Sequence, residues 1–346
     1  MSLGPPLTCR ALGYTFTFPP EVRELRGVAV LQLPPGLKRA SLELIECLRS
    51  VGVEPVVEID PTFGSCDLHL PQIRDALGEG VTVLHVGHTP YPPELSSWPQ
   101  MRGVRVLYVA VTFDGAPSEE VLARAAELLT AKGVRKVSVL TTAQHVNVYD
   151  IVVRALSSRG LTVIRAGSRL PYLYEGQVLG CDYRVVPRGA DGYVMLGGGA
   201  FHAIGLYLAT LRPVIQVDPY RQEARDVTPE GERVLRVRLQ KVSESIDASR
   251  WGVIIGLKTG QHRPWVVNAL LASMRHHNKR YVLLASDLLT PSYLRDVDSD
   301  WFQAFVVTSC PRLPIDDLSD YEKPVLTPGE AFMALQGRLE PYIFPW

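Results

Sequence analysis

The chain of 346 residues carries 36 Lys and Arg against 36 Asp and Glu, so its formal net charge is zero. A neutral chain supplies no general field for nucleic acid or an anionic membrane, and no apolar run reaches the roughly 18 residues of a membrane span. The first residues lack the basic start and apolar core of a signal peptide, so we expect a cytoplasmic protein without membrane or direct nucleic-acid partners.

The first part of the chain predicts a strand, helix, strand order. Pro34-Pro35-Gly36 breaks the first apolar run, and Leu42, Ile45 and Leu48 form one face of the helix that follows. Alternation of apolar strands with amphipathic helices is typical of parallel sheets covered by helices. The predicted elements are strands over 28–33, 56–59, 81–86 and 104–111 and helices over 38–51 and 70–77.

The rest of the chain repeats this order twice, and the tail from Pro324 to Trp346, which contains four prolines, is expected along the surface. The next elements are helices over 118–131, 148–159 and 201–210 and strands over 136–140, 161–165, 193–196 and 213–218. The last elements are strands over 251–257, 281–285 and 305–307 and helices over 265–275 and 291–296.

One cysteine follows the apolar elements in each repeat. Cys66, Cys181 and Cys310 are separated by 115 and 129 residues, a period of domain size. We therefore expect an α/β fold of three similar domains with parallel sheets flanked by helices, arranged around a central pseudo-threefold site. The expected domains are 1–115 with Cys66, 116–225 with Cys181, and 226–346 with Cys310 plus the tail.

The five cysteines include no CxxC pair and are odd in number, which argues against a disulfide framework in a reducing compartment. Cys47 lies beside Leu44 and Leu48 in a predicted helix, so we interpret it as a core residue. Nothing in the sequence marks Cys9 as a ligand. For Cys66, Cys181 and Cys310 the possible roles are metal binding, catalysis or core packing.

A small residue precedes each of these three cysteines, as in Ser65-Cys66, Gly180-Cys181 and Ser309-Cys310. Small residues allow the backbone to approach a bulky inorganic group. For one cysteine, chance is the better explanation of such a placement at the end of an apolar segment. Chance is a poor explanation when all three repeats have a cysteine at the equivalent position. Three thiolates suit zinc or an iron–sulfur cluster, and a four-iron cluster with three protein ligands keeps one iron open.

Seven segments of the chain resemble the archaeal diphthamide-synthesis family, a radical S-adenosylmethionine (SAM) family without the CxxxCxxC motif. The loop that ends at Cys181 is the most specific of them. The segments are Leu31-Gln32-Leu33-Pro34-Pro35-Gly36-Leu37, Asp60-Pro61-Thr62-Phe63-Gly64-Ser65-Cys66, His85-Val86-Gly87-His88, Gly176-Gln177-Val178-Leu179-Gly180-Cys181, Gly197-Gly198-Gly199-Ala200-Phe201-His202, Asp300-Trp301-Phe302-Gln303 and Ser309-Cys310-Pro311-Arg312-Leu313-Pro314-Ile315-Asp316.

The resemblance implies a transferase. It would move the 3-amino-3-carboxypropyl group of SAM to the imidazole C2 of a histidine in translation elongation factor 2, the first step of diphthamide biosynthesis. A 3-amino-3-carboxypropyl radical would form at a [4Fe-4S] cluster held by Cys66, Cys181 and Cys310. The resemblance also implies a homodimer and an external electron donor.

Two segments depart from the family pattern, which affects the expected SAM contacts. F-H-P is Phe201-His202-Ala203 here, and G-T-L-G-R-Q-G is replaced by residues 256–262, GLKTGQH. Backbone N–H groups of Gly197, Gly198 and Gly199 could hold the SAM carboxylate or hydroxyls, but a tight strand–helix turn explains them equally well. The stretch does not fit the GxGxxG pattern of a dinucleotide site. Gln177 and Gln261 are further candidates for SAM contacts.

His85 and His88 lie three residues apart at a strand end, and a structural role is favoured over metal binding. Two other functions remain open. A quinolinate-synthase-like enzyme would use three domains, three cysteines and a [4Fe-4S] cluster for a dehydrating condensation without SAM. A non-catalytic, cluster-bearing subunit would relay electrons to a partner.

Overall fold

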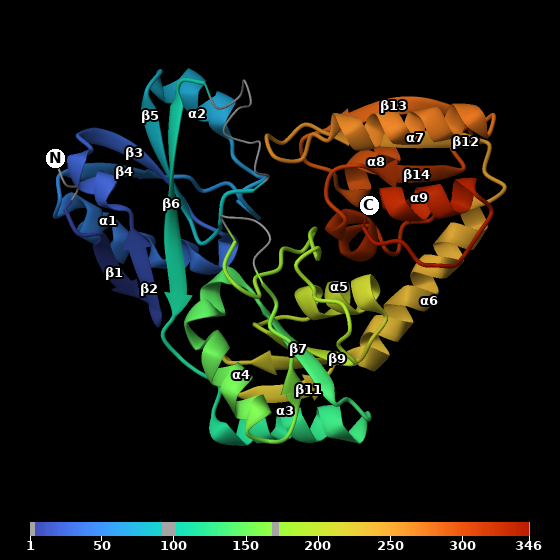
Figure 1. Cartoon of the computed structure of the whole chain (residues 1–346). Helices are drawn as coiled ribbons and strands as arrows, with labels where there is room; N and C mark the ends of the chain where they lie inside the picture. Colours follow the sequence, from blue (N-terminus) through green and yellow to red (C-terminus); the bar gives the residue numbers. More distant parts are fainter. Residues whose placement is uncertain (1–3, 92–101, 168–172, 346) are drawn as a thin grey trace.

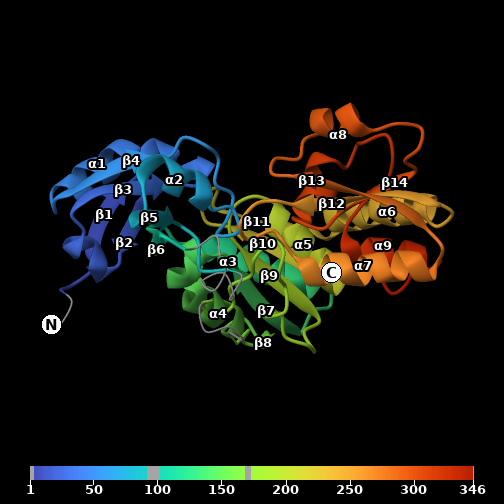
Figure 2. The same ribbon diagram turned by 90° about the horizontal axis from the view of Figure 1, so that it is seen from above.

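Three β-sheets form the centres of three lobes, which are arranged around a common centre (Figures 1 and 2). The computed structural model describes residues 4–91, 102–167 and 173–345. Along the chain, the lobes are blue, green to yellow, and orange to red in Figure 1. Helices flank mostly parallel sheets, which confirms the predicted α/β class. The three domain ranges themselves stay a prediction.

The first lobe contains the sheet β1-β2-β6-β5-β3-β4. Its strands are β1 (Leu7–Ala11), β2 (Tyr14–Phe18), β3 (Gly27–Gln32), β4 (Val53–Val57), β5 (Val81–Val86) and β6 (Val104–Phe113), and its helices are η1 (Pro20–Glu24), η2 (Pro35–Ala40), α1 (Ser41–Arg49) and α2 (Leu70–Leu77). Strands β3 to β6 pair in parallel, as predicted.

An antiparallel hairpin of β1 and β2 extends this sheet beyond β6, and it was not predicted. Leu12 and Gly13 form its turn with positive φ angles of 54° and 75°, which suits a two-residue hairpin loop. Phe16 and Phe18 point into the core and are fully buried. The alternation of apolar residues in both strands was therefore the available signal.

The second lobe contains the sheet β11-β10-β9-β7-β8, in which only β11 is antiparallel to its neighbour. Its strands are β7 (Lys136–Thr141), β8 (Thr162–Val163), β9 (Gly192–Leu196), β10 (Val214–Asp218) and β11 (Glu223–Asp226), and its helices are α3 (Glu119–Ala131), η5 (Ala143–Val148), α4 (Tyr149–Ser157) and α5 (Phe201–Thr210). Ser118 begins α3 by accepting a hydrogen bond from the backbone N–H of Val121.

The third lobe contains the all-parallel sheet β13-β12-β14-β15. Its strands are β12 (Arg250–Gly256), β13 (Arg280–Ser286), β14 (Ala304–Val307) and β15 (Val325–Leu326), and its helices are α6 (Thr228–Ser245), α7 (Pro264–His276), α8 (Pro291–Val297), the π-helical turn η6 (Leu313–Asp317) and α9 (Pro328–Leu335). Helix α6 connects the second lobe to the third in Figure 1.

Two expectations for this lobe were wrong. Helix α6 was missed because its sequence is polar and its buried positions include Arg238 instead of a continuous apolar stripe. The tail was expected along the surface, but β15 and α9 are buried in the core of the lobe. The prolines did not prevent this, because Pro328 occupies the first helical turn, where proline is tolerated, and Thr327 and Glu330 form a capping box.

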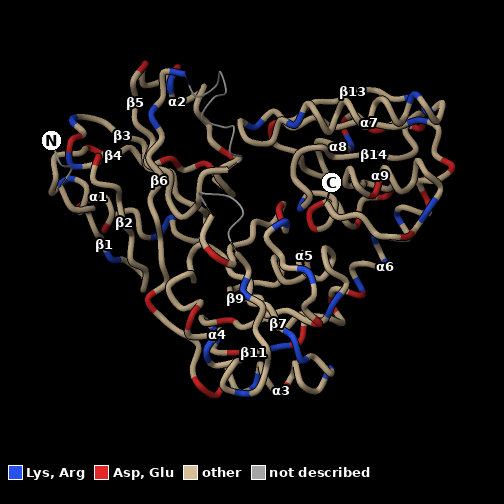
Figure 3. The backbone as a smooth tube through the Cα atoms, viewed as in Figure 1, with Lys and Arg blue, Asp and Glu red and all other residues tan. Residues whose placement is uncertain are grey.

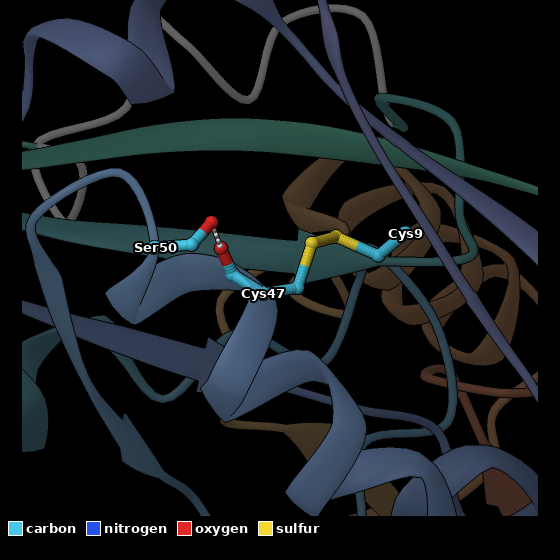
Figure 4. Close-up of a disulfide and its surroundings, with 3 residues drawn as sticks. All are labelled: Cys9, Cys47 and Ser50. Carbon is cyan, nitrogen blue, oxygen red and sulfur yellow. Dashed lines mark hydrogen bonds between the residues drawn. A yellow bond between two sulfur atoms is a disulfide. The ribbon is translucent and has the colours of Figure 1, made fainter.

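The prediction against disulfides was also wrong, since Cys9 and Cys47 form one (Figure 4). Helix α1 packs beside β1 and brings the two Cα atoms to 6.2 Å, within the range that a disulfide can span. Cys47 does pack against the first core, as expected, and Cys9 is buried in it. The odd number of cysteines could not show which two of the five thiols the fold brings together.

Removing this bridge is expected to destabilise the first lobe without changing the iron content. The bridge spans 38 residues of chain, and a loop of that length corresponds to about 2–4 kcal/mol of unfolding free energy. Cys47→Ala should therefore unfold at a lower denaturant concentration than the unaltered chain. Equal unfolding midpoints under oxidising conditions, or loss of iron on reconstitution, would contradict this expectation.

Charges of both signs are interspersed over all three lobes, in keeping with the neutral composition (Figure 3). Within the described ranges, no helix is both long and apolar enough to cross a bilayer. Residues that line one cavity follow the carboxyl ends of strands β4, β5, β7, β9, β12 and β14 of the three sheets. Ligands of open α/β sheets usually bind at such ends.

Candidate functional site

The three cysteines outside the disulfide, Cys66, Cys181 and Cys310, line one cavity of about 240 Å³ where the lobes meet. Cys66 comes from the first lobe, Cys181 from the second and Cys310 from the third. As whole residues the three cysteines are partly exposed, while burial is the largest influence on the pKa of each thiol. The other lining residues used below are Tyr91, His88, Gln177, His202, Gln261 and Arg312.

The loop that carries Cys66 is held from two lobes. Ser65 donates from its hydroxyl to the carbonyl of Tyr91 at 3.1 Å within the first lobe. From the third lobe, the backbone N–H of Gly260 donates to the carbonyl of Cys66 at 2.9 Å, and Thr259 donates from its hydroxyl to the carbonyl of Leu68 at 2.7 Å. The segment after β12 thus fixes the first cysteine.

A buried ion pair strengthens this contact. The Asp67 carboxylate is fully buried and lies 2.5 Å from Nζ of Lys258 and 3.3 Å from Nε2 of His69. Burial alone would raise the pKa of Asp67, but hydrogen bonds from His69 and Lys258 outweigh it and lower that pKa. Hydrogen bonds to Asp67 and Glu58 raise the pKa of His69 to about 10, so His69 is cationic at neutral pH. Its contribution to stability is complete below about pH 6.5 and falls progressively as the pH rises from there to about 10.

Cys181 lies in a tight turn in which Leu179 and Asp182 exchange backbone hydrogen bonds of 3.2 and 3.0 Å. A Cβ on Gly180 would lie 2.2 Å from the ring of Phe201, so only glycine fits before this cysteine. The small residue predicted to admit an inorganic group is therefore also required by packing.

Cys310 follows β14 after three residues, which confirms that Pro311 comes after the end of a buried strand. The carbonyl of the preceding Ser309 accepts a short hydrogen bond from Nη1 of Arg263, and the carbonyl of Cys310 accepts one from Leu313 at 3.2 Å. The guanidinium of Arg312 lies 4.9 Å from the ring centre of Phe201 of the second lobe. Each cysteine loop thus contacts a neighbouring lobe.

A buried arginine acts on all three thiols. Burial raises the pKa of Cys181 to about 12 and that of Cys310 to about 11, and it also raises the pKa of Cys66. The positive charge of Arg263 opposes this rise in each case. Further positive charge, such as bound metal ions would supply, would therefore favour the thiolate form at this site.

Three thiols on one cavity wall are a donor set that an iron–sulfur cluster could use. No group of three His, Cys, Asp or Glu side chains within the described ranges is arranged to hold one metal ion. The three thiols instead share the wall of one cavity. An iron–sulfur cluster is ligated by thiolates spread around a larger body, which this arrangement suits.

Residues 33–343 match the protein family described as "Putative diphthamide synthesis protein". The chain belongs to this family. It is 32% identical over 330 residues to the 2-(3-amino-3-carboxypropyl)histidine synthase of Pyrococcus horikoshii, covering 93% of this chain and 91% of that one. It is also 26% identical to subunit 1 of the human 2-(3-amino-3-carboxypropyl)histidine synthase, covering 93% of this chain and 72% of the human one.

Solved structures of a family member have the same fold. The crystal structure of Pyrococcus horikoshii Dph2 with a 4Fe-4S cluster superposes with a TM-score of 0.78 at 29% identity, covering 94% of this chain and 92% of that one. A second crystal structure of the same protein gives the same TM-score. The predicted family and its fold are thereby confirmed.

The residues expected to contact SAM are divided between the cavity and the turn between β9 and α5 of the second lobe. Gln177 lines the cavity, but its amide is engaged with the Thr89 hydroxyl at 2.8 Å and the backbone N–H of Tyr174 at 3.0 Å. Gln261 lines the cavity with Nε2 3.7 Å from Sγ of Cys66. Both remain predicted SAM contacts of this diphthamide-synthesis family member.

The three glycines are not among the described residues that line the cavity. The carbonyls of Gly197 and Gly199 accept hydrogen bonds from the side chain of Gln216 at 3.0 and 2.8 Å. A Cβ on Gly198 would lie 2.8 Å from the ring of Tyr220. The tight-turn interpretation is sufficient for this segment, and SAM binding by Gly197, Gly198 and Gly199 stays a prediction.

Sequence reasoning missed three residues that hold the cysteine loops in place. Arg263, Lys258 and Asp67 make the contacts described above, and no spacing pattern in the chain marks them. The one signal was indirect: the segment 256–262 departs from the family pattern at the place where it contacts Cys66.

Proposed function

We propose that this chain transfers the 3-amino-3-carboxypropyl group of SAM to the imidazole C2 of a histidine in translation elongation factor 2. The observation that carries the proposal is the cavity shared by Cys66, Cys181 and Cys310 in a chain of the diphthamide synthesis family. The three thiols would hold a [4Fe-4S] cluster. A homodimer, an external electron donor and action in the cytoplasm belong to the same proposal.

The chain's own residues would supply position and environment. A bound cluster would supply the electron that cleaves a carbon–sulfur bond of the SAM sulfonium. Gln177 and Gln261 lie in the cavity wall, where they are placed to orient SAM. Arg263 carries a fixed positive charge beside the thiols, and the Lys258–Asp67 pair keeps the Cys66 loop in place. Which carbon–sulfur bond breaks would depend on this positioning, since about 1.4 kcal/mol of barrier changes a rate tenfold.

The family match over residues 33–343 favours this function over a quinolinate-synthase-like enzyme. One observation supports the electron-relay alternative. Several eukaryotic relatives are named as subunit 1 of the synthase, and a relay would need a partner subunit. A relay would bind a cluster but would leave the histidine unmodified.

Anaerobic incubation of the reduced protein with SAM and elongation factor 2 tests the proposal. We expect methylthioadenosine and a 3-amino-3-carboxypropyl group on one histidine, detected by peptide mass spectrometry. Methylthioadenosine without modified histidine would favour the relay. Quinolinate formed from its precursors, with no methylthioadenosine, would favour the condensation enzyme.

A further inference from the structure

A chain of polar side chains runs from the core of the first lobe to the wall of the three-cysteine cavity. Gln32 and His85 pair across strands β3 and β5, and both are fully buried. Nδ1 of His85 lies 3.0 Å from Oε1 of Gln32, and Nε2 of His85 lies 3.1 Å from Nδ1 of His88. His88 is the member of this chain that lines the cavity.

The turn between the two histidines is built for this contact. Gly87 has a φ of 80°, in the left-handed region that favours glycine, and its carbonyl accepts a hydrogen bond from the side chain of Gln144. The ring centres of His85 and His88 are 5.0 Å apart. The backbone thus turns His88 back over His85 and holds its ring at the cavity.

With the Gln32 amide placed so that Oε1 faces His85, the order of hydrogen bonds assigns the hydrogens. The amide oxygen of Gln32 can only accept, so Nδ1 of His85 donates and Nε2 of His85 accepts. His88 therefore donates from Nδ1, and its Nε2 carries the lone pair. Burial lowers the pKa of His85 well below 6.5 and that of His88 to about 4, against an opposing effect of Asp67 on His88. Both rings are neutral at pH 7.

The described cavity wall contains no carboxylate, and its two neutral nitrogen bases are His88 and His202. We propose that His88 is a catalytic residue whose Nε2 accepts the proton released from C2 of the substrate histidine, with His85 and Gln32 as its positioning residues. The inference rests on the proposed function and deepens it, because it names the base that completes the transfer.

The electrons and atoms of this step balance. When the 3-amino-3-carboxypropyl radical bonds to C2, that carbon still carries its hydrogen and the ring holds one unpaired electron. The ring becomes aromatic again by losing one electron and the C2 proton. The electron returns to the oxidised iron–sulfur cluster, the C–H bonding pair stays in the ring, and the proton goes to His88. One electron is used in bond cleavage and one is recovered, so no reductant is consumed overall.

The test uses elongation factor 2 with deuterium at C2 of the modified histidine, together with His88→Gln and His202→Gln in the full-length chain. With the unaltered chain we expect no primary isotope effect, because proton loss is fast. His88→Gln should slow the proton loss by about 10²–10⁴-fold, as expected for removal of a general base, so that this step limits transfer. It should also show a primary isotope effect and release more methylthioadenosine than modified histidine.

His202→Gln serves as the matched comparison and is expected to show no isotope effect. Equal transfer rates and no isotope effect in His88→Gln would overturn the role of His88, and an isotope effect confined to His202→Gln would assign the base to His202. Absence of transfer by the unaltered chain would contradict the proposed function instead. If His88→Gln fails to bind iron, His88→Gly with added imidazole is tested in its place. If iron-loaded His88→Gly does not regain transfer when imidazole is added, the role of His88 is also overturned.

Discussion

Replacing Gly260 with alanine is expected to remove most of the bound iron. A Cβ at this position would lie 2.3 Å from Cα and 3.0 Å from the carbonyl carbon of Cys66, and real Cβ atoms do not approach backbone so closely. The clash can be relieved only by moving the Cys66 loop away from the segment after β12. A ligand shifted by 1 Å no longer meets the geometry that its site requires.

Iron per chain after anaerobic reconstitution, with the brown absorbance of the cluster, measures this effect. Gly36→Ala is the matched control, because a Cβ there meets nothing within 4 Å. We expect Gly36→Ala to bind as much iron as the unaltered chain. Full iron content in Gly260→Ala would show that the third lobe does not position Cys66.

Replacing Arg238 with methionine is expected to destabilise the third lobe by about 3–5 kcal/mol, as when one partner of a buried ion pair is removed. The Arg238 guanidinium is 2.9 and 2.6 Å from the two carboxylate oxygens of Glu330. It also donates to the carbonyls of Pro314 and Val325 at 2.8 and 2.7 Å. Its loss leaves a buried carboxylate and two carbonyls without this donor, and it releases α6 from the turn that follows Cys310.

Denaturant unfolding followed by tryptophan fluorescence, to which the buried Trp251 contributes, measures this change in the third lobe. Arg295→Met is the control, because its ion pair with Glu322 is exposed and such pairs contribute up to about 1 kcal/mol. Adding Glu330→Leu to Arg238→Met should recover part of the lost stability by removing the unpaired charge. Equal unfolding midpoints for Arg238→Met and Arg295→Met would contradict the expectation.

Local patterns predicted the elements that follow local rules. The helices over 70–77 and 201–210 have the predicted bounds, because apolar periodicity and flanking turn residues mark both ends. Strand β14 ends before Cys310, as expected. Helix α6 was missed because its buried Arg238 is stabilised by partners about 76–92 residues away, and no local pattern encodes them.

The residues of the candidate site also divide into those that local sequence patterns predicted and those that depend on contacts between lobes. The small residues before the cysteines and the domain-sized spacing predicted the three thiols that line the cavity. Gly260, Arg263 and Lys258 could not be predicted, because their roles depend on how the third lobe meets the first. The disulfide was missed for a related reason, since the pairing of Cys9 with Cys47 depends on the contact between α1 and β1.

The central claim is that Cys66, Cys181 and Cys310 together hold one [4Fe-4S] cluster. Iron content and Mössbauer spectra of the reconstituted chain test it most directly, in parallel with Cys66→Ala, Cys181→Ala, Cys310→Ala and Cys47→Ala. We predict about four irons per chain with the spectrum of a [4Fe-4S] cluster in the unaltered chain and in Cys47→Ala, and a severe loss in each of the other three. Iron retained by Cys310→Ala at the level of Cys47→Ala would contradict the claim.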